Sequence, residues 1–358
     1  MLLVHYARIH LAYTAEQGSD RRRRRYHVGT VPRVGGLAFC LGLLAALAWS
    51  GWRGLVGREA AYLILAALPA LAAGLAEDIT KRVTPQIRLL ATLLAALLAV
   101  VLLQAYIHHV QIGLVDAWLS WRPPQWTWAP LGVLLTIIGV AGVANAINII
   151  DGFHGLAAAV CIIMMGAIGY VGWIVGDTLI VQLALAYMGA LLGFLLWNYP
   201  KGLIFLGDGG AYLAGFLLAQ AGVLLVVRNP QVTPWFVLLV CAYPVVETLF
   251  SIYRKAFVRN VSPTMPDGLH MHMLVYRRLL RWSAGNAVAR EVTARNAATS
   301  PYLWALCSLA VVPAVLLWSQ PIGLQIALAV YVFIYIAMYV RLVRFRSPSW
   351  LRRHIGSR

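Results

Sequence analysis

The feature of this sequence that most constrains its fold is a series of apolar stretches, each close to twenty residues long. There are about ten of them, at 34–52, 59–76, 87–107, 128–147, 155–175, 178–197, 209–227, 233–252, 301–318 and 321–341. A helix of about 20 residues, rising about 1.5 Å per residue, crosses about 30 Å of hydrocarbon. Because hydrocarbon offers the backbone no hydrogen-bond partner, such stretches cross it as helices. The sequence therefore predicts an all-α polytopic membrane protein with about ten transmembrane helices.

The distribution of positive charge predicts the orientation of this chain in the membrane. The formal net charge is +17, and a basic run such as Arg21 to Arg25 is also seen in nucleic-acid-binding arms. If the chain starts in the cytoplasm and alternates sides, however, only four of the 29 Lys and Arg residues fall outside: Arg53, Arg58, Arg122 and Arg228. The positive-inside rule describes this asymmetry. We therefore expect both termini in the cytoplasm, no nucleic-acid partner, and an anchoring role for Arg21 to Arg25 at the membrane surface.

The chain reads as a single integral-membrane domain over 1–358. Within it we expect a cytoplasmic loop at 253–300 and a basic cytoplasmic tail at 342–358. The cysteines all fall inside predicted helices without metal-ligand spacing: Cys40, Cys161, Cys241 and Cys307. We interpret them as packing residues, so neither a disulfide framework nor a zinc site is expected.

Polar residues that could bind a metal or take part in a reaction lie in the loops predicted to face the cytoplasm. Glu77, Asp78, Asp151 and Asp208 each stand at a cytoplasmic helix end, in a chain with only 12 acidic residues. Taken singly, each is equally well explained as a solvated helix cap. Taken together with Asn148, they form a set of hard oxygen donors without thiolates, which suits Mg²⁺ or Mn²⁺. A magnesium site at a membrane surface suggests a phosphorylated substrate.

Two further patterns agree with a phosphorylated substrate. Gly207, Gly209 and Gly210 flank Asp208, and we expect them to let a phosphate approach the backbone at the start of a helix. Farther along, "HMHM" at 270–273 lies in a basic loop with Arg277 and Arg278, an arrangement suited to holding a diphosphate. An isolated His-x-His pair is equally well explained as a structural pair.

Five motifs give the chain a resemblance to a known family. In order, they are "RYHVGTVPRVGG" at 25–36, "EDITK" at 77–81, "NIIDGFHG" at 148–155, "FLGDGG" at 205–210 and "HMHM" at 270–273. In this order and on one predicted face, they resemble the motifs of the polyprenyl-phosphate N-acetylhexosamine-1-phosphate transferases, the glycosyltransferase family that includes phospho-N-acetylmuramoyl-pentapeptide transferase. The resemblance covers nearly the full length.

The resemblance implies a reaction and a set of roles. Members transfer a sugar 1-phosphate from a UDP-N-acetylhexosamine to undecaprenyl phosphate in the bacterial inner membrane, releasing UMP, with Mg²⁺ at a cytoplasmic active face. Asp208 corresponds to the principal metal ligand and Asn148 to a second residue near the metal. Asp78 and Glu77 match the acidic pair that engages or deprotonates the lipid phosphate. The remaining matches are Asp151, Gly152, Asn198 and Phe205 around the nucleotide, and Lys81, His270, His272 and Arg277 near phosphates.

The sequence departs from the family pattern at three motif positions. Glu77 replaces an aspartate, His154 replaces a carboxylate near the nucleotide, and Met273 replaces the last histidine of its cluster. These changes fit altered substrate preference better than lost catalysis. The chain also offers only "MLLVHYARIH" where family members carry an additional helix, so either this branch lacks that helix or the assigned start is too late.

Two other classes of function stay open beside the transferase. One is a catalytically silent scaffold. The other is a transporter of a polyprenyl-linked substrate, which is disfavoured because Glu247 is the only acidic residue well inside a span and no paired broken helices are evident. The identity of the sugar and of the polysaccharide, such as O-antigen, is not readable from the sequence, and a homodimer is expected only by analogy.

Overall fold

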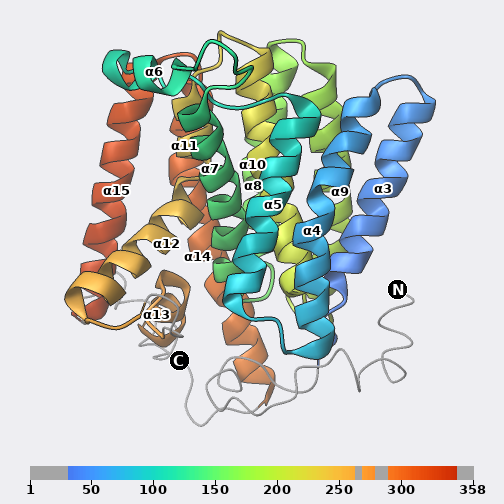
Figure 1. Ribbon diagram of the computed structural model, residues 1–358. Coiled ribbons are helices and arrows are strands. Elements are labelled where there is room, and N and C mark those ends of the chain that lie inside the picture. Colours follow the sequence, from blue (N-terminus) through green and yellow to red (C-terminus); the bar gives the residue numbers. More distant parts are fainter. Residues whose placement is uncertain (1–30, 263–267, 279–288, 345–358) are drawn as a thin grey trace.

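The computed structural model describes residues 31–262, 268–278 and 289–344, and Figure 1 shows a bundle of helices. Within these ranges, nine helices are long and apolar enough to cross a membrane. They are α3 (Gly35–Trp52), α4 (Arg58–Thr80), α5 (Pro85–Leu103), α7 (Pro130–Ile150), α8 (Leu156–Ile174), α9 (Thr178–Asn198), α10 (Gly207–Arg228), α14 (Ala289–Leu316) and α15 (Pro321–Val343). The prediction of an all-α polytopic membrane protein is confirmed.

The predicted span at 233–252 is a broken helix. Its two halves, α11 (Pro234–Val240) and α12 (Ala242–Tyr253), meet at an angle of 73°. Pro244 lies just after the break, where its ring removes one backbone N–H and crowds the carbonyl of Val240. If the bent pair is one span, the described chain has ten. We find no second bent pair in the described ranges, so the paired broken helices of a transporter are not seen there.

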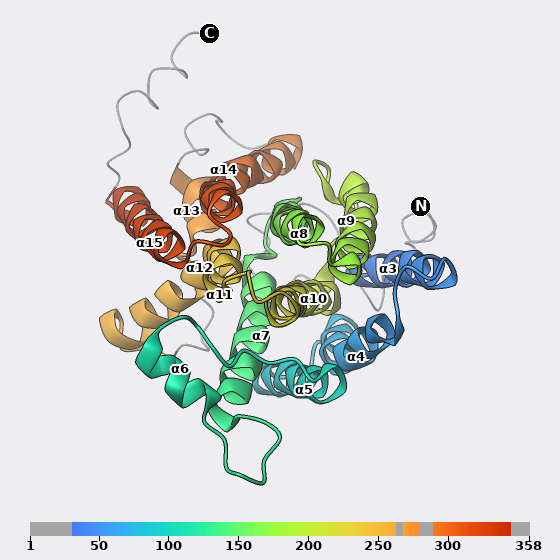
Figure 2. The same cartoon turned by 90° about the horizontal axis from the view of Figure 1, so that it is seen from above.

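Helix α10 is the centre of the bundle. Figure 2 shows it surrounded by α3, α4, α5, α7, α8 and α9, and 94% of its apolar stretch is buried. The close contacts depend on glycines. A Cβ on Gly36 of α3 would stand 2.4 Å from the backbone nitrogen of Gly210, and one on Gly74 of α4 would stand 2.5 Å from the Cα of Gly209. Both helices can therefore approach the start of α10 only because these positions carry no side chain.

This packing corrects one sequence-based prediction. We expected Gly207, Gly209 and Gly210 to open space for a phosphate beside Asp208. Instead, Gly209 faces Leu75 of α4 and Gly210 faces Gly36 of α3, so both are occupied by helix packing. Position 207 also requires glycine, since its φ is +77° and a Cβ there would stand 2.6 Å from Asp78 Oδ2.

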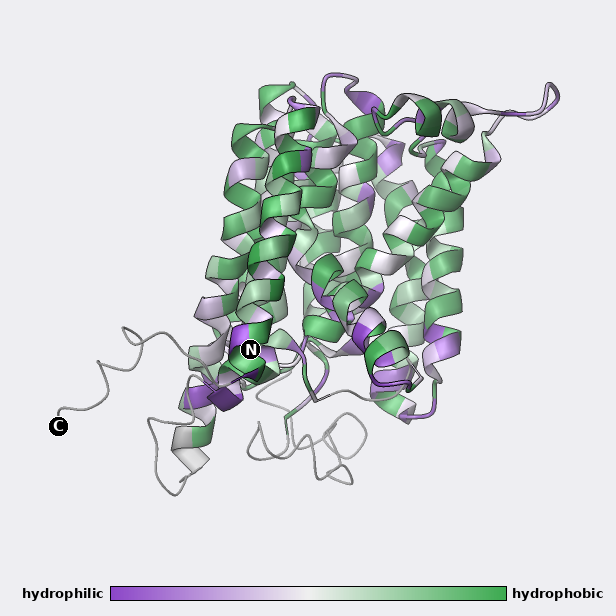
Figure 3. Ribbon diagram, turned by 90° about the vertical axis from the view of Figure 1, so that its left-hand side faces the viewer, coloured by the Kyte–Doolittle hydropathy of each residue, from purple (hydrophilic) through white to green (hydrophobic). Residues whose placement is uncertain are grey.

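The two ends of the bundle differ. Figure 3 shows apolar residues along its middle and polar residues at the ends. One end carries the short helix α6 (Gly113–Ser120), and the other carries the loops with the predicted motifs. The predicted loop at 253–300 is largely helical where it is described, with a π-helical turn at Arg254–Val258, α13 (Met271–Arg278) and the start of α14. The run Arg21 to Arg25, the motif residues 25–30 and the tail beyond residue 344 lie outside the described residues.

Candidate active site

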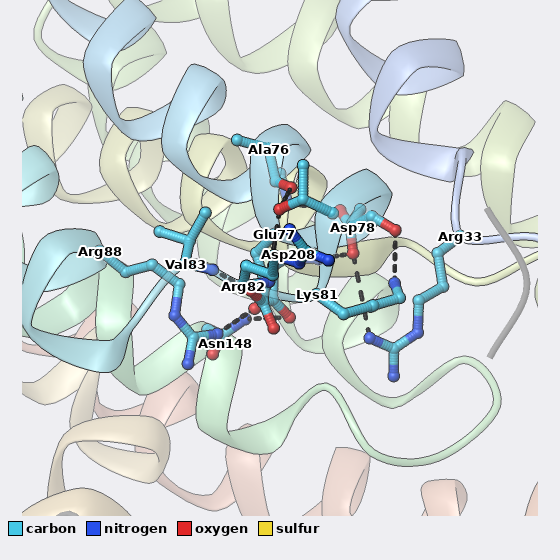
Figure 4. Close-up of polar contacts among 12 residues, drawn as sticks. Arg33, Ala76, Glu77, Asp78, Lys81, Arg82, Val83, Arg88, Asn148 and Asp208 are labelled. Atoms are coloured by element: carbon cyan, nitrogen blue, oxygen red, sulfur yellow. Dashed lines mark hydrogen bonds and ion pairs between the residues drawn. The ribbon is translucent and has the colours of Figure 1, made fainter. Parts of the chain in front are cut away.

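Asp208 lies in the first turn of α10 and is contacted from two other helices. Its Oδ2 forms an ion pair with Arg88 of α5, and its Oδ1 accepts a hydrogen bond of 3.2 Å from the amide Nδ2 of Asn148, near the end of α7. Figure 4 shows these side chains converging. The side chain of Asp208 is 18% exposed, so the carboxylate can still be reached from the loop end of the bundle. The predicted pairing of Asp208 with Asn148 is thus seen, and Arg88 joins them.

Asp78 holds the start of α10. Its Oδ1 accepts the backbone N–H of Asp208 at 3.0 Å and its Oδ2 accepts that of Gly209 at 2.9 Å, while Arg33 lies 4.0 Å away. A carboxylate at a helix N-terminus satisfies unpaired N–H groups and complements the helix dipole. The side chain is only 2% exposed. In this geometry Asp78 caps α10 and orients Asp208; the lipid-phosphate role implied by the resemblance stays a prediction.

Glu77 and Lys81 shape the turn after α4. Glu77 Oε2 accepts the backbone N–H of Val83 at 2.8 Å, which ties the turn back to the helix. Lys81 ends α4 in the left-handed conformation (φ 56°), and its Nζ donates to the carbonyl of Asp78. Burial, and secondly the charge of Arg33, lower the pKa of Lys81. Lys81 therefore lies close to Asp78, and Figure 4 shows Arg33 on the same side.

Asp151 and Gly152 form the turn that follows α7. Burial, and secondly the neighbouring charge of Asp208, raise the pKa of the Asp151 carboxyl to about 7. Neighbouring carboxylates that repel one another mark a place where a positive charge would be stabilised. The turn therefore contributes to the same electrostatic site as Asp208.

The loop at 198–206 packs on the segment after α7. Asn198 and Phe205 belong to the loop, and His154 belongs to the segment that it contacts. Asn198 accepts the N–H of Gly155 at 2.5 Å and donates to the carbonyl of Ile204 at 2.7 Å. The Nδ1–H of His154 donates to the carbonyl of Pro200 at 3.1 Å, and its ring lies 5.9 Å from that of Phe205. Burial lowers the pKa of His154, which favours a neutral imidazole. His154 is only 4% exposed, so it supports the loop and shows little surface to a substrate.

The start of α14 holds the same turn from its other side. Asn296 Oδ1 accepts the N–H of His154 at 2.8 Å, Ser300 Oγ donates to the His154 carbonyl at 2.6 Å, and Trp304 Nε1 donates to the carbonyl of Gly155 at 3.2 Å. Sequence reasoning missed all three, since they lie 142, 146 and 149 residues from the residues they contact. It also missed Arg88, whose signal was its position as a lone cation at the inner end of an apolar span.

The histidine pair lies beside the same turn. The rings of His270 and His272 stack at 5.4 Å between centroids with an interplanar angle of 5°. Phe153 meets the ring of His272 edge-on at 5.4 Å, and a Cβ on Gly152 would stand 3.5 Å from His272 Nε2. Arg277 follows on α13, near Gly268. Met273, the departure from His-x-His-His, packs partly buried against the apolar core.

The residues around Asp208 suit a magnesium ion that is shared with a substrate. Within the described residues, no group of three His, Cys, Asp or Glu side chains is placed to hold a metal unaided. Mg²⁺ is commonly held by one or two carboxylates together with substrate phosphates. The carboxylate of Asp208, the adjoining side chain of Asn148 and the raised carboxyl pKa of Asp151 fit such a partial site.

Comparison with known protein families gives a match to part of the chain. The model of glycosyl transferase family 4 matches residues 60–226, a range that holds Glu77, Asp78, Asn148, Asp151 and Asp208. Over these residues the chain is similar to glycosyl transferase family 4. This match agrees with the family resemblance drawn from the five motifs.

Similar proteins with curated names agree with the family. A probable undecaprenyl-phosphate N-acetylglucosaminyl 1-phosphate transferase of Bacillus subtilis is 27% identical over 70% of this chain and 66% of its own length. An undecaprenyl-phosphate alpha-N-acetylglucosaminyl 1-phosphate transferase of Salmonella typhi is 26% identical over 71% of this chain and 67% of its own length. One of the same name from Thermotoga maritima is 31% identical over 26% of this chain and 30% of its own length. The matches thus span at most about two thirds of these relatives.

Proposed function

We propose that this protein transfers an N-acetylhexosamine 1-phosphate from a UDP-sugar to undecaprenyl or another polyprenyl phosphate. The observation that carries the proposal is the meeting of Asp208, Asn148 and Arg88 at one end of a membrane bundle. Two of these residues belong to motifs shared with the family, and the similar proteins are named for this activity. We place the site at the cytoplasmic face of the bacterial inner membrane, where it would initiate a cell-envelope polysaccharide such as O-antigen.

The proposed reaction is a phosphoryl transfer. An oxygen of the lipid phosphate attacks the sugar-bearing phosphorus of the donor, and the bond from that phosphorus to the bridging oxygen breaks, so that UMP leaves. Such a reaction is accelerated mainly by positioning and by neutralising charge. Mg²⁺, or Mn²⁺, would be held by Asp208 and Asn148, and it would supply charge neutralisation at the diphosphate.

In the proposed reaction, the other residues of the site position the substrates and neutralise their charge. Arg88, already beside Asp208, is placed to neutralise a phosphate that enters the site. Asp78 keeps Asp208 oriented through the first N–H groups of α10. Lys81 and Arg33, on the opposite side of Asp78, offer further cationic groups for the lipid phosphate. Asp151 and Phe205 face the region where we place the nucleotide, with Asn198 and His154 holding the loops that form it.

A direct assay tests the proposal. Purified protein is mixed with undecaprenyl phosphate, Mg²⁺ and a panel of radiolabelled UDP-amino sugars, and the release of UMP is measured. We expect release with at least one sugar and a loss of about a hundredfold or more in Asp208→Asn, because a charge that acts in the transition state is removed. Glu59→Gln, which removes a carboxylate from the opposite end of α4, is the control and keeps full activity.

Two outcomes contradict the proposal. If no sugar gives UMP with the wild-type protein, the chain is a silent relative or a transporter. If Asp208→Asn loses thermal stability in parallel with activity, Asp208 is structural rather than part of the reaction.

A further inference from the structure

Glu247 is a buried acidic residue that the proposed reaction does not use. It lies in α12, the inner half of the bent span, and only 1% of it is exposed. A carboxylate in an apolar span is costly and persists only where other groups satisfy it. Its hydrogen bonds therefore show what it does.

All the hydrogen bonds of Glu247 that the structure describes run to two places. Its Oε1 accepts from His270 Nδ1 at 2.9 Å and from the backbone N–H of Met271 at 3.0 Å. Its Oε2 accepts from the hydroxyl of Tyr335, on α15, at 2.7 Å. Met271 is the first residue of α13, so Glu247 caps that helix from another segment and holds the side chain of the residue before it.

The same short segment is held at its other side. The carbonyl of Leu269 accepts from Arg254 Nη1 at 3.0 Å and from the hydroxyl of Tyr339 at 3.1 Å. Residues 269–271 are thus clamped between the bent span and α15. The segment that carries the histidine pair has little freedom to move away from the turn after α7.

The clamped histidines touch the candidate site. His270 stacks on His272, and His272 packs on Phe153 and Gly152, next to Asp151. His272 is 1% exposed, and within the described chain its Nδ1 is a buried nitrogen without a hydrogen-bond partner. A buried nitrogen left unsatisfied lowers stability, so a pair arranged in this way is not optimised for stability alone.

We propose that Glu247 is a positioning residue that fixes the His270–His272 pair against the Asp151–Gly152 turn of the transferase site. This inference rests on the proposed function, because it assigns the histidine pair a part in that reaction. The half of the bent span that follows the break carries this carboxylate to the segment at 269–271.

The test uses Glu247→Gln, which keeps the size of the side chain and removes its charge. We expect its kcat/KM to fall about tenfold to a hundredfold, because reacting groups that are slightly misplaced lose about this much. Glu247→Asp, which restores the charge, recovers part of the loss. Tyr335→Phe removes only the contact to Oε2 and, as the matched control, stays within about twofold of the wild type.

A double variant separates positioning from a structural role. If Glu247 acts through the histidine pair, the kcat/KM of the double variant Glu247→Gln, His272→Asn is no lower than that of His272→Asn alone. Additive losses, or wild-type kcat/KM in Glu247→Gln, overturn the proposal.

Hydrogen exchange distinguishes failure of this inference from failure of the proposed function. Amides at 270–275 should exchange faster in Glu247→Gln than in the wild type. In Tyr335→Phe their exchange rates should equal those of the wild type. Both results are expected whether or not any UDP-sugar is turned over. Unchanged exchange in Glu247→Gln overturns the positioning role even if the protein proves to be the proposed transferase.

Discussion

Asp78 shows at the scale of a single residue how a motif acid can serve the fold and the site together. It caps α10 with both oxygens, so Asp78→Asn replaces one acceptor by an NH₂ group that faces a backbone N–H. Loss of a cap costs about 0.5–2 kcal/mol. We expect a lower apparent Tm in detergent for Asp78→Asn and a much smaller change for Glu77→Gln, whose amide oxygen can still accept from Val83. Equal Tm values for Asp78→Asn and the wild type would contradict the capping role.

The lowered pKa of His272 predicts how the stability of the folded protein depends on pH. An imidazole has an ordinary pKa of about 6.5, and burial, followed by the charge of His270, lowers the pKa of His272 to about 3. Between these values the unfolded chain binds a proton that the folded chain does not. Stability is therefore full above about pH 6.5 and falls by about 1.4 kcal/mol per pH unit below it. His154, whose pKa is also lowered by burial, adds to this fall.

Thermal unfolding at pH 7.5 and pH 5.5 measures this dependence. We expect a lower apparent Tm at pH 5.5 and a smaller difference between the two pH values in His272→Asn. Glu247 and His270 face the same ring, and both stay in place in this variant. His108→Asn, at an exposed position on the opposite end of the bundle, leaves the difference unchanged. The same pH difference in His272→Asn as in the wild type would show that His272 is not the group responsible.

At the scale of the helix, packing around α10 depends on a few glycines. A Cβ on Gly74 would stand 2.5 Å from the backbone of Gly209, whereas one on Gly139 of α7 meets nothing within 4 Å. Gly74→Ala should therefore force α4 away from α10 and cost about 1–3 kcal/mol. Gly139→Ala should stabilise the protein by up to about 1 kcal/mol, since alanine is the better helix former. Apparent Tm values that shift in the same direction would contradict this account.

The spans were predictable from the sequence because each is a local run of apolar residues. The break in the span at 233–252 was not predicted, although Pro244 is visible in the sequence. Proline alone does not decide it, since α4 contains Pro69 and continues as one helix. Whether a proline breaks a span depends on neighbouring helices that a linear reading does not contain.

At the scale of the whole molecule, the site was predictable only in part. Motif order brought Asp208, Asn148 and Asp78 to one end of the bundle, and the structure brings them together there. Arg88, Asn296 and the role of Glu247 were missed because each contact joins residues far apart in the sequence. The glycines beside Asp208 were misread for the same reason, since the helices that fill the space beside them are α3 and α4.

The orientation of the whole bundle gives the last prediction. The positive-inside count places the end with Lys201 in the cytoplasm and the end with Gln125 outside. Single cysteines at these two exposed positions can show on which side of the membrane each position lies. The native cysteines interfere little, because three of the four are buried and the fourth is only partly accessible. In intact cells a membrane-impermeant maleimide should label Gln125→Cys, while Lys201→Cys is labelled only after permeabilisation. The parent protein measures background from Cys40. Labelling of Lys201→Cys in intact cells would place the candidate site outside, where no cytoplasmic UDP-sugar could reach it, and would remove the proposed transferase along with it.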